Sequence, residues 1–299
     1  MSTASTLDLL IERVTAGGRL TAAEIAELSA APDILSLGML ADEARRRLHG
    51  AQVTYLRVAI VAFDQSLAGG VPTAAREVRV TGTPSTLDAA VAAIQRATEA
   101  AGGRVVSGLS WRDVDRMASA AGVPVARALE TLRGAGLDAL ADVPLDGVGD
   151  LENVVASLAG AGFRQLRFTI EDAPAQARAE LFEHAAALQE QHRCIQAINP
   201  LPTLLNAVRA STGYDDVRAV AIARLAAPNI PTVQVDWLRY GPKLAQVALT
   251  FGADDLDAVS VGDDAPDGRR RAPLEEVRRS IEAAGFSAAE RDGRFNVVA

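Results

Sequence analysis

Short runs of apolar and β-branched residues alternate along this chain with longer stretches in which apolar residues recur every three or four positions. The short runs predict strands, and the longer stretches predict helices. Several runs are apolar throughout, as is typical of parallel strands that are buried on both faces. The eight predicted strands are Val53–Ala62, Glu77–Thr81, Val105–Ser107, Leu137–Leu140, Gln165–Ile170, Ile195–Ile198, Val233–Asp236 and Ala258–Val261.

Helix starts and stops separate many of these runs. Thr21 and Glu24 form the pattern of a capping box, and Ser85 is the expected N-cap of a helix whose first turn holds Asp88. Pro174 is expected at the first position of another helix, since proline is tolerated there. The predicted helices are 22 onward, 35–48, 86 onward, 174–189, 217–225, 242–249 and 274–284.

Strand followed by helix, repeated eight times, predicts a (β/α)8 TIM-like barrel with N-terminal helices and a C-terminal helix and tail. A doubly wound open sheet is the alternative, because a local pattern does not show closure. Only about a dozen residues separate Phe63 from Glu77, so we expect a shortened first crossover without a full helix. We divide the chain into a helical extension (1–50), the barrel (51–265) and a C-terminal helix and tail (266–299), packed as one structural unit.

Composition narrows the class of protein. Apolar residues make up 49% of the chain and aromatic residues only 4%, so the core must be mainly aliphatic. The net charge of −8 argues against nucleic acid and against an anionic membrane surface as partners, since both attract basic proteins. We find no run of about eighteen apolar residues and no signal-peptide order at the N-terminus, and therefore expect a cytoplasmic protein.

Metal-ligating side chains are sparse. Cys194 is the single cysteine, which excludes a disulfide framework and any cysteine-based zinc or iron–sulfur site within one chain. The three histidines, His49, His184 and His192, are too scattered to predict a zinc cluster. We therefore expect no metal site.

Two stretches carry a resemblance to a known family. Residues 37–55 read LGMLADEARRRLHGAQVTY, and residues 217–261 include Asn229-Ile230-Pro231 and the run GPKLAQ at 241–246. Both resemble the radical-SAM enzymes aminofutalosine synthase and dehypoxanthine futalosine cyclase, and more distantly deazaflavin synthase. The resemblance implies a barrel and a link to the futalosine route of menaquinone biosynthesis.

This chain differs from the family it resembles in the loop that binds the iron–sulfur cluster. After V-T-Y, the family carries C-x-x-x-C-x-x-C, whose thiolates hold a [4Fe–4S] cluster with SAM on the fourth iron. Here the same place reads LRVAIVAFDQSLAGG, which contains no cysteine. Because thiolates hold such clusters, we expect a radical-SAM-like pseudoenzyme without iron–sulfur cluster or other cofactor.

Candidate site residues follow the strands, because function in such barrels lies at the carboxyl ends of the strands. The expected ligand-binding residues are Asp64, Thr81, Thr83, Ser107, Asn199 and Trp237. The candidate catalytic residues are Glu171, Asp172 and Asp236, which could act in acid–base chemistry. Asp172 instead suits a helix cap before Pro174, and Trp237 suits plain packing.

Two functions remain open at this point. The one we favour is a non-catalytic partner or regulator, which would pair with a radical-SAM paralogue or another futalosine-pathway enzyme. The alternative is a cluster-independent enzyme or binder, acting on a futalosine-like nucleoside or an aromatic carboxylate.

Overall fold

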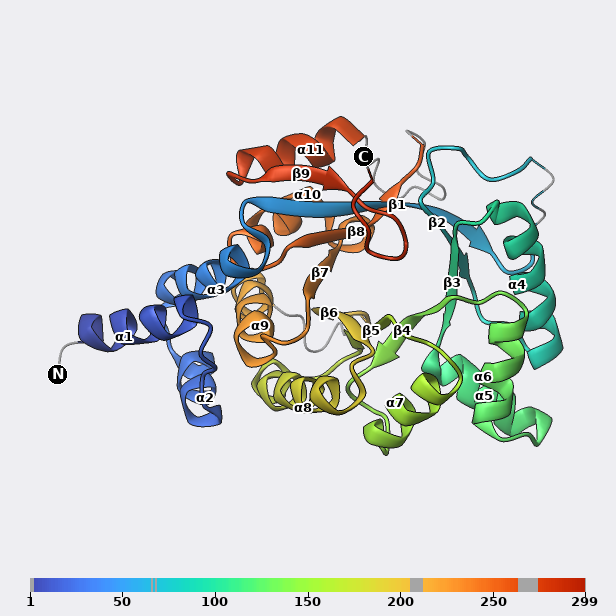
Figure 1. Cartoon of the computed structure of the whole chain (residues 1–299), viewed down its shortest axis with the longest axis horizontal. Coiled ribbons are helices and arrows are strands. Elements are labelled where there is room, and N and C mark those ends of the chain that lie inside the picture. The colour runs from blue at the N-terminus through green and yellow to red at the C-terminus, as the bar shows by residue number, and fades with distance from the viewer. Residues whose placement is uncertain (1–2, 66, 68, 205–211, 263–273, 299) are drawn as a thin grey trace.

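Eight parallel strands close into a barrel in the computed structural model, which describes residues 3–65, 67, 69–204, 212–262 and 274–298. Each strand pairs with the next one along the chain, and β1 also pairs with β8 (Figure 1). This closure confirms the predicted barrel over a doubly wound sheet. The strands are β1 (Gln52–Ala62), β2 (Glu77–Thr81), β3 (Val105–Ser110), β4 (Ala139–Pro144), β5 (Leu166–Ile170), β6 (Ile195–Pro202), β7 (Thr232–Asp236) and β8 (Asp255–Ser260).

Helices surround the barrel, and three more precede it along the chain (Figure 1). The preceding helices are α1 (Thr3–Thr15), α2 (Ala22–Ala30) and α3 (Ile34–His49). The surrounding helices are α4 (Leu87–Ala101), α5 (Trp111–Ala121), α6 (Val125–Gly134), α7 (Leu151–Gly160), η1 (Ala175–Ala177), α8 (Arg178–His192), α9 (Gly213–Ala226), α10 (Trp237–Leu249) and α11 (Leu274–Ala283). In the described part of the chain, no helix combines the length and the apolar character needed to cross a membrane.

The first crossover carries no helix among its described residues, as the sequence predicts. Phe63 ends β1 by donating its backbone N–H to the carbonyl of Thr81, at 2.9 Å. The loop then returns to the start of β2, where Arg76 donates to the carbonyl of Arg57 at 2.9 Å. A loop therefore leaves the mouth of the barrel between β1 and β2.

A ninth strand, β9 (Ser287–Glu290), was not predicted. It runs parallel to the first half of β1, in the register Gln52 with Ser287. β2 pairs only with the second half of β1, beginning at Val58 with Glu77. At the amino end of the barrel, β9 is therefore a neighbour of β1 where β2 is not.

Several predicted helix starts differ from the structure, including that of α9, which begins at Gly213 and not at residue 217. Thr86, rather than Ser85, caps α4 by accepting a hydrogen bond from the Ala89 N–H at 3.2 Å. After Pro174 the chain forms the short 3₁₀ turn η1 before α8 begins. Helix α10 starts at Trp237, but Gly241 at φ 74° is not helical and divides it, so its second part begins at Pro242 as predicted.

Strand residues alternate between a polar lumen and an apolar outer face. In β2, Glu77 and Arg79 contact lumen residues of other strands, whereas Val78 and Val80 belong to the buried hydrophobic core. The lumen of such a barrel is usually filled by branched apolar side chains. The buried polar strand residues here include Glu77, Ser107, Arg167, Thr169, Asn199, Gln234, Asp255 and Asp257.

Candidate ligand site at the mouth of the barrel

A cavity of about 410 Å³ lies in the barrel and is lined by residues of seven of its strands and of the start of α10. Small-molecule sites typically measure about 300–1,000 Å³, so the cavity is large enough for a compact ligand. No aromatic side chain is among its lining residues. The lining residues are Ile60, Arg79, Thr81, Ala141, Asp142, Thr169, Asn199, Gln234, Asp236, Leu238, Arg239, Asp257 and Ala258.

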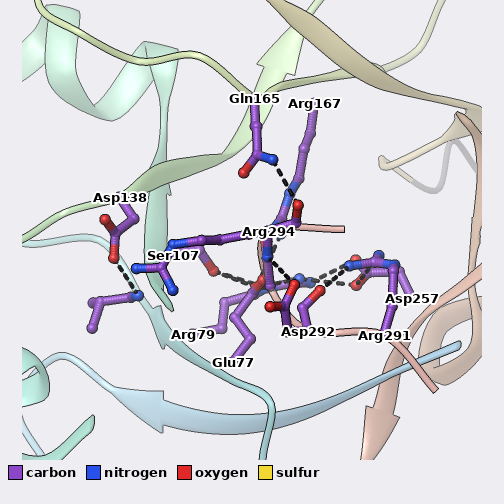
Figure 2. A network of polar contacts seen from close by, with 12 residues as sticks. Glu77, Arg79, Ser107, Asp138, Gln165, Arg167, Asp257, Arg291, Asp292 and Arg294 are labelled. Atoms are coloured by element: carbon purple, nitrogen blue, oxygen red, sulfur yellow. Dashed lines mark hydrogen bonds and ion pairs between the residues drawn. The ribbon is translucent and has the colours of Figure 1, made fainter. Parts of the chain in front are cut away.

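An arginine between two carboxylates forms the floor of the cavity (Figure 2). Arg79 donates to Asp257 through Nη1 at 2.8 Å and Nη2 at 3.0 Å, which is a bidentate pair. It also donates to Glu77 through Nε at 3.0 Å and Nη2 at 2.7 Å. Ser107 donates its hydroxyl to the same Glu77 at 2.6 Å. All three guanidinium nitrogens of Arg79 are thus hydrogen-bonded, which fixes its orientation.

Below the floor, Arg167 and Arg291 contribute two further ion pairs (Figure 2). Arg167 donates to both oxygens of Glu77, at 2.9 and 2.6 Å. Arg291 donates to both oxygens of Asp255, at 2.6 and 2.7 Å. All four side chains are at most 2% exposed. Buried charges are tolerable only when paired in this way.

The C-terminal tail supplies part of this lower layer. The ring of Phe295 lies 3.9 Å from the Arg291 guanidinium and 5.4 Å from that of Arg167. The carbonyl of Gly293 accepts a hydrogen bond from Arg167, and the carbonyl of Arg294 accepts one from Gln165 (Figure 2). The tail that follows β9 therefore contacts the barrel from its amino end, opposite to the mouth.

The charged groups of the cavity floor, Arg79, Glu77 and Asp257, remain ionised. Burial opposes ionisation of Glu77, but the guanidiniums of Arg167 and Arg79 hold the pKa of this carboxyl well below its ordinary value. Burial likewise disfavours the Asp257 carboxylate, but Arg79 lowers its pKa overall. The pKa of Arg79 is raised, since Asp257 and Glu77 outweigh its burial. The floor consequently stays ionised at neutral pH.

Two carboxyls higher in the cavity behave in the opposite way. Burial, reinforced by the negative charge of Asp257, raises the pKa of Asp236 to about 6. Burial also raises the pKa of Asp142, because the nearby Arg239 and Arg79 compensate only in part. Asp236 caps α10 by accepting a hydrogen bond from the Arg239 N–H at 2.8 Å. Asp142 forms no hydrogen bond or ion pair with any residue in the described part of the chain.

Asp236→Asn is expected to stabilise the protein by roughly 1–2 kcal/mol at pH 8 and to have little effect near pH 4. Folding raises the pKa of this carboxyl from its ordinary value of 3.8 to about 6. The wild-type protein therefore loses stability as the pH rises through this window, whereas asparagine stays neutral and still caps α10. Urea unfolding at both pH values measures the difference. An equal effect of Asp236→Asn at both pH values would contradict a raised pKa of Asp236. Asp64→Asn, at an exposed position, is the control.

The structure brings three of the sequence-predicted residues together at the cavity, namely Thr81, Asn199 and Asp236. Ser107 lies in the ion-pair layer through its bond to Glu77. The remaining predicted residues do not line the cavity: Asp64 and Thr83 are exposed, Trp237 is buried, and Glu171 and Asp172 are half-buried in the loop after β5.

The loop after β5 is held by a residue that sequence reasoning did not single out. Asp146 accepts hydrogen bonds from the backbone N–H groups of Glu171, Asp172 and Ala173, at 2.7 to 2.8 Å. Glu171 itself pairs with Arg112. Neither η1 nor α8 has a side-chain cap, so the alternative assignment of Asp172 as a helix cap is wrong.

Six polar lining residues were not predicted: Arg79, Asp142, Thr169, Gln234, Arg239 and Asp257. Most occupy alternate positions in otherwise apolar strands. That alternation was the available signal, because in a closed barrel every second residue of a strand faces the lumen. Among the described residues, no group of three or more His, Cys, Asp or Glu side chains is arranged to hold a metal ion.

Comparison with known sequences links the chain to one group of enzymes. Residues 196–298 match the family model described as the CofH/MqnC C-terminal region. The chain is 35% identical over 124 residues to a 5-amino-6-(D-ribitylamino)uracil–L-tyrosine 4-hydroxyphenyl transferase from Archaeoglobus fulgidus, which covers 37% of this chain and 36% of that enzyme. It is 33% identical over 94 residues to aminodeoxyfutalosine synthase from Streptomyces coelicolor, covering 29% and 24%.

One further relative aligns over most of this chain, but at lower sequence identity. Cyclic dehypoxanthine futalosine synthase from Streptomyces coelicolor is 23% identical over 321 residues, which covers 87% of this chain and 80% of that enzyme. The matches at higher identity thus span well under half of the relatives' lengths.

Solved structures share the fold. Methylornithine synthase (PylB) superposes with a TM-score of 0.68 at 13% identity, over 94% of this chain and 97% of that one. The FeFe-hydrogenase maturase HydG from Carboxydothermus hydrogenoformans gives 0.67 at 12% identity, over 96% and 80%. These likenesses establish the barrel and assign no activity.

Proposed function

Since the chain is a relative of the CofH/MqnC group of radical-SAM enzymes, we propose that it is a cluster-independent member of that group, which binds a small nucleoside-like ligand in the cavity above Arg79 and Asp257. The observation that carries this proposal is the open, polar cavity at the mouth of a barrel whose first loop contains no thiolate. A cytoplasmic location belongs to the same proposal.

The residues present do not fit a [4Fe–4S] cluster with bound SAM. The loop after β1 begins with Phe63, Asp64 and Gln65, and no cysteine occurs before β2. Phe63 packs so closely over Gly82 that a Cβ there would lie 2.7 Å from its ring. Cys194 directly precedes β6, so it lies at the amino end of the barrel, opposite to the mouth. It is 1% exposed, and burial raises the pKa of its thiol.

Charge supports a nucleoside-like ligand over an aromatic carboxylate. Three aspartates line the cavity against two arginines, and Arg79 already pairs with Asp257 and Glu77. A ligand carboxylate would find only Arg239 as a counter-ion. The relatives' names refer to futalosine compounds and to a ribitylaminouracil, which are polar and rich in hydroxyl groups.

If the ligand is also transformed, we propose Asp236 as the acid–base group. Its pKa of about 6 lies close to neutral pH, where a carboxyl can both accept and return a proton. Glu171 is less suited to this role, since it pairs with Arg112 outside the cavity. Asp172, our third candidate, does not line the cavity either.

Calorimetric titration with futalosine and aminodeoxyfutalosine tests binding. We expect saturable heat with at least one of them, and a loss of roughly tenfold or more in affinity in Ala141→Phe, whose ring would enter the cavity. Asp64→Asn, outside the cavity, is the matched control and should bind as the parent does. No heat and no thermal shift with either compound would refute the nucleoside proposal.

A second candidate, the non-catalytic partner favoured by the sequence, is supported by an exposed apolar pair on α3. Leu35 and Met39 lie one turn apart and are 72% and 63% exposed. We propose that this face would contact a radical-SAM relative of the futalosine pathway. Leu35→Ser with Met39→Ser should then abolish co-purification of such an enzyme, whereas exposed Tyr214→Ser should not. If no such relative co-purifies with the parent chain, this candidate fails.

A further inference from the structure

We infer that the occupant of the cavity carries a protonated amine, for which Asp142 and Asp236 are the counter-ions. This inference rests on the proposed function, because it assigns a chemical class to the ligand of the same cavity. It differs from the proposal of a nucleoside-like ligand in that it predicts the sign of the ligand's charge and the residues that recognise it.

When Asp142 and Asp236 are both ionised, the charges around the cavity do not cancel. In the ion-pair layer, Arg79, Arg167 and Arg291 oppose Glu77, Asp255 and Asp257, so this layer is neutral. Above it, Asp142 and Asp236 face the cavity together with Arg239. Two carboxylates against one guanidinium leave one negative charge at the cavity wall. A ligand with a single positive charge restores neutrality.

Neither upper carboxylate forms a direct ion pair in the described part of the chain, although the charge of Arg239 acts on both. Asp142 forms no hydrogen bond or ion pair there, and Asp236 accepts a hydrogen bond from the backbone N–H of Arg239 in α10, at 2.8 Å. A half-buried carboxylate without a directly bound cation is costly to ionise, which agrees with the raised pKa of both groups. An ammonium group placed against them would offset that cost through charge-assisted hydrogen bonds.

An unpartnered hydroxyl points independently to a polar occupant. Thr169 lines the cavity, is 3% exposed, and its Oγ1 has no hydrogen-bond partner. Thr169 lies in register with Asn199 on β6, whose Oδ1 accepts from Leu201 at 3.3 Å and whose amide group can still donate. Buried hydroxyls without partners are rare in folded proteins. A ligand that bears hydroxyl or amino groups would satisfy both side chains.

A divalent metal ion is a poorer occupant. Such ions need several carboxylate or imidazole ligands at one point, and no group of three or more suitable side chains meets among the described residues. Arg239 at the cavity wall would also repel a dication. An organic monocation with hydrogen-bonding groups therefore fits the lining better.

Three adenosine derivatives that differ only at the 5′ carbon test the inference: 5′-amino-5′-deoxyadenosine, adenosine and adenosine-5′-carboxylic acid. Calorimetry with the full-length protein at pH 7.5 should rank their affinities in that order. The amine should bind at least about tenfold more tightly than adenosine, since hydrogen bonds to charged groups are stronger than neutral ones.

Asp142→Asn and Asp236→Asn separate this inference from the proposed function. Each should reduce the preference for the amine over adenosine to within about threefold. Asp64→Asn should retain the full preference, and circular dichroism checks that every variant folds. Equal binding of amine and adenosine, or tightest binding of the carboxylate, overturns the inference and leaves a nucleoside site. Failure of all three to bind overturns the proposed function as well.

Discussion

Glu77→Gln is expected to lower the free energy of unfolding by roughly 3–5 kcal/mol, as removal of one partner of a buried ion pair usually does. Glu77 is fully buried and accepts hydrogen bonds from Arg79, Arg167 and Ser107. Arg79 would keep Asp257 as a partner, but Arg167 would keep only uncharged contacts, such as the carbonyl of Gly293 and the ring of Phe295. The variant would thus bury an uncompensated guanidinium in the barrel.

Urea unfolding followed by circular dichroism measures this loss, because urea does not screen charges as guanidinium does. The matched control is Glu130→Gln on α6, whose partner Arg127 lies 3.2 Å away with both side chains largely exposed. That change should alter stability by less than about 0.5 kcal/mol. A loss below about 1 kcal/mol in Glu77→Gln would show that the buried network is not essential to the fold.

Arg291→Met is expected to lower the free energy of unfolding by roughly 3–4 kcal/mol, because it too removes one partner of a buried ion pair. This ion pair lies at the C-terminal tail. The change removes the bidentate pair with Asp255 and the contact of the guanidinium with Phe295 at 3.9 Å. Asp255 would keep hydrogen bonds from Thr54 and Gln234, yet its charge would have no cation in direct contact. The tail should detach from the amino end of the barrel more readily than in the parent.

A double-mutant cycle with Asp255→Asn tests this explanation. If the cost arises from an unpaired buried carboxylate, the double variant should be more stable than the sum of the two single losses predicts, by about 1 kcal/mol or more. Strict additivity would mean that Arg291 stabilises the tail through packing alone. Since Gln234 links Asp255 to the cavity, the titrations described above should also weaken in Arg291→Met.

The local pattern of apolar and polar residues was sufficient to predict the barrel. It was not sufficient to predict the charged residues inside the barrel. The eight strands stand out because their outward faces are β-branched and apolar, as in Val78 and Val80 of β2. Strand β9 escaped prediction because its sequence, Ser-Ala-Ala-Glu, is short and lacks β-branched residues. Its place is set by pairing with β1, more than two hundred positions earlier in the chain.

Only part of the candidate site could be predicted, because long-range contacts leave no local signal in the sequence. Thr81, Asn199 and Asp236 were found because they lie at or near the carboxyl ends of strands. Arg79 and Asp257 are 178 residues apart in sequence, so nothing local reveals that they form a bidentate pair. Asp142 was missed because β4 was expected to end at Leu140, whereas it continues to Pro144 and carries Asp142 into the lumen.

The most direct test of a cluster-independent function is anaerobic reconstitution of the purified protein with iron and sulfide. After removal of unbound metal, we expect iron well below one atom per chain and no cleavage of S-adenosylmethionine, since the chain's one thiol lies buried at the far end of the barrel. Binding of about four irons per chain, together with reductive cleavage of S-adenosylmethionine, would contradict the account.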